Sequence, residues 1–204
     1  MVGALGDPPT SWDTAPAVLG VSAGTAFVRL HDPLFSASNP HPVSDPSEHR
    51  TAGPYHRFDH QIPAEPARGI AYGAELLTGA LAEVYGSIRV IDRLATMHVG
   101  FFAPQRDVEL IDLRGQGSLA VGATAELMTT PDRNLSQRWA RWLYERYEWA
   151  CGVAFVGRYA GCLCVAMWER APLERRSPSL PLATPRIFSL VELWADRYGF
   201  IIDR

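Results

Sequence analysis

The sequence predicts an α+β domain with enough strand content for two packed mixed β-sheets. Short apolar runs typical of strands recur along the chain, and amphipathic stretches typical of helices separate them. The 204 residues are 47% hydrophobic, which is sufficient to bury a full core. We therefore expect one main domain, with less regular segments at both ends.

The chain is expected to begin with an irregular segment, residues 1–22. This segment contains an early Asp7 and a proline pair, and it lacks the basic region of a signal peptide. The first predicted strand is residues 25–30, in which Arg29 alternates with two apolar neighbours. If those neighbours face the core, Arg29 points to the other side of the sheet. An exposed arginine on an edge strand is the alternative.

A long loop is predicted at residues 31–68, which include seven prolines and five histidines. His56 and His60 stand four residues apart beside Asp59, a spacing that raises the question of a metal site. The surrounding prolines argue against a helix that would bring both imidazoles to one face, and no HExxH pattern is present. We therefore expect no metal site. Tyr55, Arg57 and Phe58 are interpreted instead as lining a pocket for an anionic, ring-bearing ligand.

The most informative stretch is residues 69–87, GIAYGAELLTGALAEVYGS. Its first residues, 69–72, are an apolar run typical of a buried strand. Residues 74–85 then carry apolar side chains at helical spacing, which predicts a helix packed on that strand. Glu83 is a single carboxylate near the end of this apolar segment. It lies either on the solvated face of the helix or in a cleft.

The second half of the chain alternates strands and helices. Residues 88–95 continue amphipathically, and a short helix is expected at 118–126. A longer helix is predicted at 132–150, with Thr130 as its N-cap and Pro131 as its first residue. The predicted strands are 97–102, 109–114, 152–156 and 162–168, of which the last two form a hairpin. A Pro-rich linker, 170–185, leads to a final helix announced by a capping box at 189–192.

Composition excludes several classes of function. The net charge is −3 without a long basic run, so binding to nucleic acid through a basic face has no support. All 19 basic residues are arginine. No apolar run reaches the roughly 18 residues of a membrane span. The three cysteines fit reduced core thiols in a cytoplasmic protein.

Several segments resemble, in order, the RES-domain family, whose fold is similar to that of ADP-ribosyltransferase toxins. These are VRLHDP with Arg29, YHRFD with Arg57, AYGAELLTGALAEVYG with Tyr72 and Glu83, NLSQRWARWL, and GVAFVGRYAGCLCVAMWERA. The resemblance implies a RES domain over residues 23–171, followed by a linker and amphipathic helix at 172–204. The chain departs from the family at Gly157, which stands where the family has its serine.

The resemblance implies a toxin of a toxin–antitoxin pair that splits nicotinamide from NAD⁺, with water or phosphate as acceptor. Glu83 would then stabilise the oxocarbenium-like transition state. Arg29 and Arg57 would hold the pyrophosphate, and Tyr72 would contact the nicotinamide ribose. Arg158, beside Gly157, is a hypothetical phosphate-binding residue. NAD⁺ is a substrate in this interpretation, and no prosthetic group is implied.

Three functions remain open at this point. The first is the NAD⁺-degrading toxin, held in check by an Xre-like antitoxin. The second is a transferase that places ADP-ribose on a protein. The third is a catalytically impaired module that acts only by binding its antitoxin, which the loss of the serine at Gly157 favours. If activity is absent, Gly157→Ser is expected to restore it. The sequence leaves homo- or hetero-oligomers open.

Overall fold

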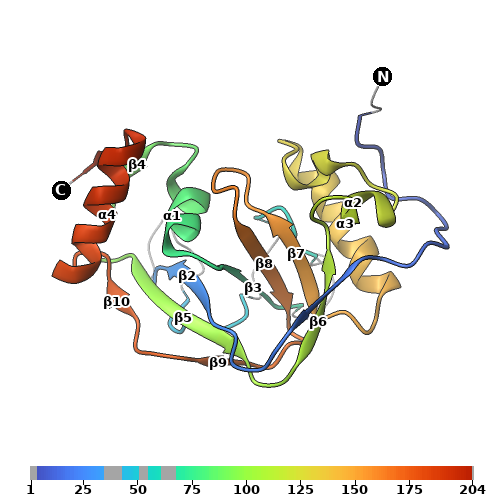
Figure 1. Cartoon of the computed structure of the whole chain (residues 1–204), viewed down its shortest axis with the longest axis horizontal. Coiled ribbons are helices and arrows are strands. Elements are labelled where there is room, and N and C mark those ends of the chain that lie inside the picture. Colours follow the sequence, from blue (N-terminus) through green and yellow to red (C-terminus); the bar gives the residue numbers. More distant parts are fainter. Residues whose placement is uncertain (1–3, 35–42, 51–54, 61–67, 204) are drawn as a thin grey trace.

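The computed structural model describes residues 4–34, 43–50, 55–60 and 68–203. Within these residues, nine strands form one curled, mixed sheet in the order β1-β6-β7-β8-β3-β2-β5-β10, with β9 also paired to β5. The pair β6–β7 is parallel, and the other pairs are antiparallel. The strands are Val18–Val21 (β1), Phe27–His31 (β2), Ile70–Ala74 (β3), His98–Pro104 (β5), Val108–Asp112 (β6), Gly152–Val156 (β7), Leu163–Trp168 (β8), Leu173–Arg175 (β9) and Leu180–Pro181 (β10). The predicted α+β class is confirmed. Where two packed sheets were expected, these nine strands belong to one sheet that curves beneath the helices (Figure 1).

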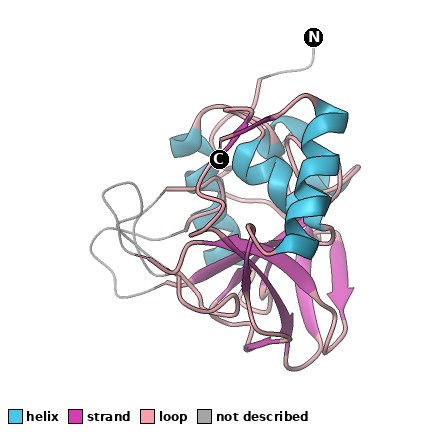
Figure 2. Cartoon of the chain, turned by 90° about the vertical axis from the view of Figure 1, so that its left-hand side faces the viewer, coloured by secondary structure: helices cyan, strands magenta, loops and turns pink. Residues whose placement is uncertain are grey.

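The helices lie together on one side of the curled sheet (Figure 2). In the described residues they are Leu77–Tyr85 (α1), Gly117–Ala120 (α2), Arg133–Arg146 (α3) and Pro185–Tyr198 (α4), with a 3₁₀ turn at Ala125–Met128. A large core cluster joins the helices to the facing side of the sheet, and a smaller cluster covers the other side. On β7, Val153 belongs to the first cluster and Ala154 to the second, and both are fully buried. Both faces of the central strands are therefore covered, which explains their continuous apolar sequences.

The strand pairing puts the site-forming segments side by side. Strand β3 lies between β2 and β8, and β8 pairs with β7 as the predicted hairpin. Helix α1 follows β3 after a short turn and packs against β2 and β3. Residues 69–87 are thus at the centre of the sheet, as expected, although α1 begins at Leu77 because Ala74 still pairs with Cys164.

Two helix starts were predicted wrongly. Helix α3 is capped by Asp132, whose carboxylate accepts a hydrogen bond from the Leu135 amide at 2.9 Å, whereas Thr130 lies two residues before this cap. The helix ends at Arg146 instead of 150. Helix α4 begins at Pro185, so the presumed capping box at 189–192 lies inside it. Proline suits the first turn of a helix because the amide it lacks has no intrahelical partner there.

The terminal segments are more closely joined to the domain than their sequences indicate. Strand β1 pairs with β6 inside the stretch expected to be irregular. Further upstream, the Trp12 indole donates to the carbonyl of Ala120 at 2.7 Å, and the Trp139 indole donates to the carbonyl of Gly6 at 2.8 Å. Within the expected linker, β9 and β10 both pair with β5. Helix α4 in turn buries Val191 and Trp194 against the core.

Residues 88–95 form turns around a two-residue strand, Val90–Ile91 (β4), which pairs in parallel with Ile201–Ile202 (β11). The expected helix at 118–126 divides into α2 and the 3₁₀ turn. The predicted loop 31–68 falls partly on residues 35–42, 51–54 and 61–67, which lie outside the described residues. No helix in the described part of the chain has the length and apolar character needed to cross a membrane.

Candidate active site

A cavity of about 500 Å³ opens between β2, β3, α1 and the β7–β8 hairpin. Its volume is in the range typical of small-molecule sites. Five of the residues predicted from the sequence line this cavity together: Arg29, Arg57, Tyr72, Glu83 and Arg158. Segments that are far apart in the chain therefore converge on one cleft.

Glu83 projects from α1 toward the β7–β8 turn. It is half-buried, and its Oε1 accepts a hydrogen bond from the Tyr159 amide at 2.9 Å. Burial raises the pKa of the Glu83 carboxyl, although the Tyr159 amide and the positive charge of Arg57 act in the opposite direction. The cleft therefore holds a carboxylate that is fixed by a backbone amide and partly shielded from water, as a site that stabilises developing positive charge requires.

Arg29 is 7% exposed on β2, so it is not the exposed edge-strand arginine that the sequence left open. Its Nη1 donates to the carbonyls of Glu48 at 2.6 Å and Pro46 at 3.2 Å. Burial, together with the nearby Arg50, lowers the pKa of Arg29 to about 10. The guanidinium is still a cation at neutral pH. It joins the loop at 46–48 to the wall of the cavity.

Tyr72 is held in a fixed orientation by Asp59. Its hydroxyl donates to Asp59 Oδ1 at 2.9 Å and accepts a hydrogen bond from the Phe58 amide at 3.0 Å. Burial and the charge of Asp59 raise the pKa of Tyr72 well above its usual range. The phenol is therefore neutral, and its ring lines the cavity beside His56, with the two ring centroids 5.4 Å apart.

The ion pair between Asp59 and Arg50 is the main feature of the site that the sequence did not predict. Asp59 is fully buried, and both of its carboxylate oxygens lie 2.7 Å from Nη2 of Arg50. It also accepts hydrogen bonds from the amides of Tyr55 and His56. Arg50 lines the cavity. The buried Asp59 carboxylate thus holds Arg50, Tyr72 and the turn at residues 55–56 together in one wall of the cavity.

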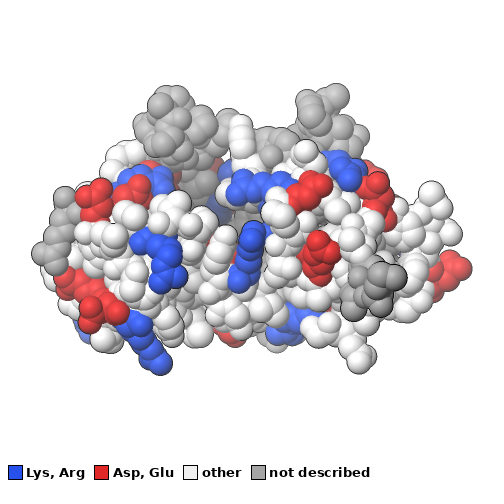
Figure 3. Space-filling model, turned by 90° about the horizontal axis from the view of Figure 1, so that it is seen from above, with Lys and Arg blue, Asp and Glu red and all other residues white. Residues whose placement is uncertain are grey.

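The cavity is strongly basic. Among its described lining residues, six arginines face two carboxylates, Asp32 and Glu83; the arginines are Arg29, Arg50, Arg57, Arg93, Arg133 and Arg158. Figure 3 views the molecule from the side of α1 and the β7–β8 turn, and basic side chains gather near the middle of that face. Guanidinium groups bind phosphate and carboxylate oxygens through paired hydrogen bonds. The cavity is therefore suited to a ligand with several negative charges.

Three predicted ligand-binding residues do not line the cavity. Tyr55 is 45% exposed, and its carbonyl accepts a hydrogen bond from Arg133. Phe58 is fully buried, with its ring 4.7 Å from that of Phe155, so it supports the cavity wall from the core. Gly157 lies directly behind Glu83, where it provides space for the carboxylate.

The two histidines of the rejected metal motif lie in different surroundings. His56 lines the cavity, whereas His60 is fully buried, with its Nε2 3.4 Å from a carboxylate oxygen of Glu169. No group of three or more His, Cys, Asp or Glu with metal-binding geometry occurs among the described residues.

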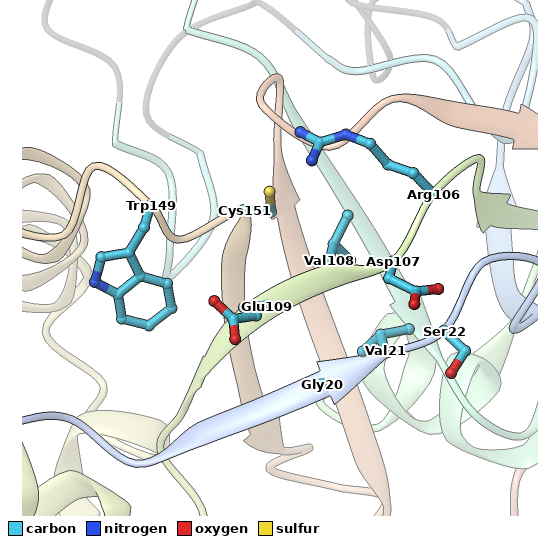
Figure 4. A pocket seen from close by; sticks show the side chains of 9 residues that line it. All are labelled: Gly20, Val21, Ser22, Arg106, Asp107, Val108, Glu109, Trp149 and Cys151. Carbon is cyan, nitrogen blue, oxygen red and sulfur yellow. The ribbon is translucent and has the colours of Figure 1, made fainter.

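A second hollow, of about 520 Å³, lies beside β1 and β6 (Figure 4). Its lining contains one arginine, Arg106, together with Asp107 and Glu109, and Trp149 lies at its other side. None of the residues singled out from the sequence as site residues lines it.

The fold and the cleft together define an α+β protein whose arginine-rich cavity holds the half-buried Glu83 carboxylate. The chain belongs to the RES-domain family, because the RES domain model matches residues 27–188. Its fold is similar to that of a chain in the crystal structure of the M. tuberculosis MbcT–MbcA toxin–antitoxin complex. The TM-score is 0.58 at 16% identity, over 86% of this chain and 92% of that one. No curated protein matches the sequence.

Proposed function

We propose that this protein is the toxin of a toxin–antitoxin pair and that it cleaves the nicotinamide–ribose bond of NAD⁺. The observation that carries the proposal is the half-buried Glu83 carboxylate, fixed inside a cavity lined by Arg29, Arg57 and Arg158. Membership of the RES-domain family and the similar fold in a toxin–antitoxin complex support it.

The cavity contains both kinds of charged group that cleavage of NAD⁺ would need, arginines and a carboxylate. NAD⁺ carries a pyrophosphate, whose negative charges the arginines would neutralise through paired hydrogen bonds. When the bond between ribose C1′ and nicotinamide N1 breaks, both electrons leave with nicotinamide and positive charge develops on the ribose. A carboxylate beside the ribose stabilises that charge more in the transition state than in the substrate. Glu83 is our candidate for this carboxylate, because its Oε1 is fixed by the Tyr159 amide. The other carboxylate in the lining, Asp32, lies 3.8 Å from Arg93.

The acceptor completes the reaction by attacking C1′. Water would add its oxygen and lose a proton to give ADP-ribose, and phosphate would add an oxygen to give ADP-ribose 1″-phosphate. Arg158 is exposed at the mouth of the cavity and lies next to Tyr159, whose amide binds Glu83. This position supports the hypothesis that Arg158 orients a phosphate acceptor.

The partner would be an Xre-like antitoxin that closes the cavity in the cytoplasm, where NAD⁺ is available. A catalytically impaired module that only binds its antitoxin is the second candidate, and the observation that favours it is Gly157. Transfer of ADP-ribose to a protein would use the same bond cleavage with a different acceptor.

The experiment that tests the proposal is nicotinamide release from NAD⁺ by the purified protein, with and without phosphate, beside Glu83→Ala. Release that depends on Glu83 is expected, and phosphate dependence would identify the acceptor. NAD⁺ binding without release would favour the impaired module. Absence of both release and binding would contradict an NAD⁺-dependent function altogether.

A further inference from the structure

The space behind Glu83 is shared by two residues of the β7–β8 hairpin. Gly157 comes directly after β7. Phe155 on β7 is paired with Cys164 on β8, so residue 157, two positions further along, is a diagonal neighbour of Cys164 on the same face. A Cβ atom added to Gly157 would lie 2.8 Å from Cys164 Sγ and 2.8 Å from Glu83 Oε1. Non-bonded carbon atoms prefer separations of about 3.5–4.0 Å, so no side chain fits there unless one of the two moves.

The two obstacles differ in how easily they move. The Glu83 carboxylate stands at the end of a flexible side chain, but its Oε1 is bonded to the Tyr159 amide. Cys164 is 2% exposed, has a single rotatable side-chain bond, and lies in the central part of the sheet. Its thiol lines the cavity. The sulfur is therefore the less mobile of the two atoms. Burial, followed by the charge of the nearby Glu83, raises the pKa of the Cys164 thiol, which shows that the two groups are close.

We propose that Gly157 and Cys164 form a complementary pair that positions Glu83. Because residue 157 has no side chain, the Cys164 thiol has room beside it. The thiol then fills the volume next to the Glu83 carboxylate and excludes water from that volume. Cys164 is thus a positioning residue and takes no part in proton or group transfer. This inference rests on the proposed function only for its kinetic consequence. The packing itself is testable in the absence of any reaction.

The pairing predicts a specific coupling between two substitutions. Gly157→Ser overpacks the site, and we expect it to lower the melting temperature of the full-length protein by roughly 3–8 °C. In a Cys164→Ala background the sulfur is absent, so Gly157→Ser should lower the melting temperature by less than half as much as in the unaltered protein. Cys151→Ala is the matched control, because Cys151 is a buried thiol on the other side of the sheet. Equal shifts in all three backgrounds would overturn the pairing.

A second measurement reports on the carboxylate itself. The ¹³C NMR titration of Glu83, assigned by the loss of its signal in Glu83→Gln, should move to lower pH in Cys164→Ala. Water entering the vacated volume relieves the burial that raises the pKa. Cys151→Ala should leave the titration unchanged. A Glu83 titration that Cys164→Ala does not alter would contradict a positioning role.

The kinetic consequence concerns turnover more than binding. Cys164→Ala should lower kcat for nicotinamide release about tenfold and change KM by less than twofold. A displaced carboxylate weakens the stabilisation of the transition state more than it weakens substrate binding. Cys164→Ser, which restores a side chain of similar shape, should recover most of the loss. Unchanged kcat in Cys164→Ala would overturn the proposal. If the unaltered protein releases no nicotinamide, the proposed function fails, while the melting and NMR measurements still decide whether the pair positions Glu83.

Discussion

The described residues line two hollows of nearly equal volume that differ in their chemistry. The cavity at Glu83 measures about 500 Å³ and the hollow at Trp149 about 520 Å³. The first is lined by six arginines, several of them anchored by buried partners, whereas the second has one arginine and two exposed carboxylates. Volume alone therefore does not distinguish the two hollows. They differ in the number of charged side chains and in how firmly those side chains are held.

Each hollow also provides controls for the other, since both contain an aspartate, a glutamate and an arginine on or near their walls. Substitutions at the cavity of Glu83 should have large effects that the equivalent substitutions at the second hollow lack. The paired variants therefore test whether the two hollows differ in function as they do in charge.

The largest effect is expected for Asp59→Ala. It leaves the side chain of Arg50, which is 9% exposed, without its carboxylate and removes the acceptor of the Tyr72 hydroxyl. Breaking a buried ion pair in this way costs about 3–5 kcal/mol of folding free energy. Urea unfolding monitored by tryptophan fluorescence would measure the loss. Asp107→Ala is the control, because Asp107 is exposed and should change stability by less than about 1 kcal/mol. Equal losses would show that Asp59 is not the anchor of the cavity wall.

The second effect concerns chemistry. Glu83→Gln keeps the shape of the side chain and removes its charge, so nicotinamide release should fall roughly 10²–10³-fold with little change in stability. Glu109→Gln, at the second hollow, should leave release unchanged. If Glu83→Gln retains full turnover, the Glu83 carboxylate is not required for nicotinamide release.

The third effect concerns substrate binding. Arg57 donates to the Thr130 carbonyl at 2.6 Å and lines the cavity beside Arg158 and Glu83. Arg57→Gln should raise KM for NAD⁺ roughly 10–100-fold, because a hydrogen bond to a charged group contributes about 1.5–3 kcal/mol. Arg106→Gln is the corresponding change at the second hollow and should leave KM unaltered. Similar KM changes in both variants would point to long-range electrostatics rather than to contact with the pyrophosphate.

Much of the fold was predictable because it follows from periodicity. The apolar runs of β3, β7 and β8 and the helical spacing of α1 are local patterns, and burial on both faces reinforces them. The pattern singled out Glu83 as an unusual carboxylate but left its position open. Its catalytic role was expected from the resemblance to the RES-domain family. Its place in a cleft follows from the strand order, which a linear pattern does not contain.

The parts that the sequence did not predict depend on contacts between distant or irregular segments. Asp59 and Arg50 pair within a loop that has no period, and the same turn points Phe58 into the core and Tyr55 to the solvent. The terminal segments gain their order from hydrogen bonds to distant partners, such as Trp12 with Ala120. The meaning of Gly157 depends on Cys164, seven residues later and across a hairpin.

The smallest expected effect is a change in the acid limit of activity, the pH at which kcat/KM falls to half its maximum on the acid side. In the proposed reaction Glu83 acts in its ionised form, so kcat/KM should fall as pH falls through the pKa of this group in the free enzyme. Burial raises that pKa, and the midpoint should therefore lie above the value of about 4.3 for a free glutamate. The positive charge of Arg57 opposes this shift. Arg57→Gln should consequently move the acid limit further toward neutral pH, whereas Arg106→Gln should not. An acid limit at or below the ordinary value, or one unaffected by Arg57→Gln, would mean that the group titrating in the rate is not the half-buried carboxylate of this cavity.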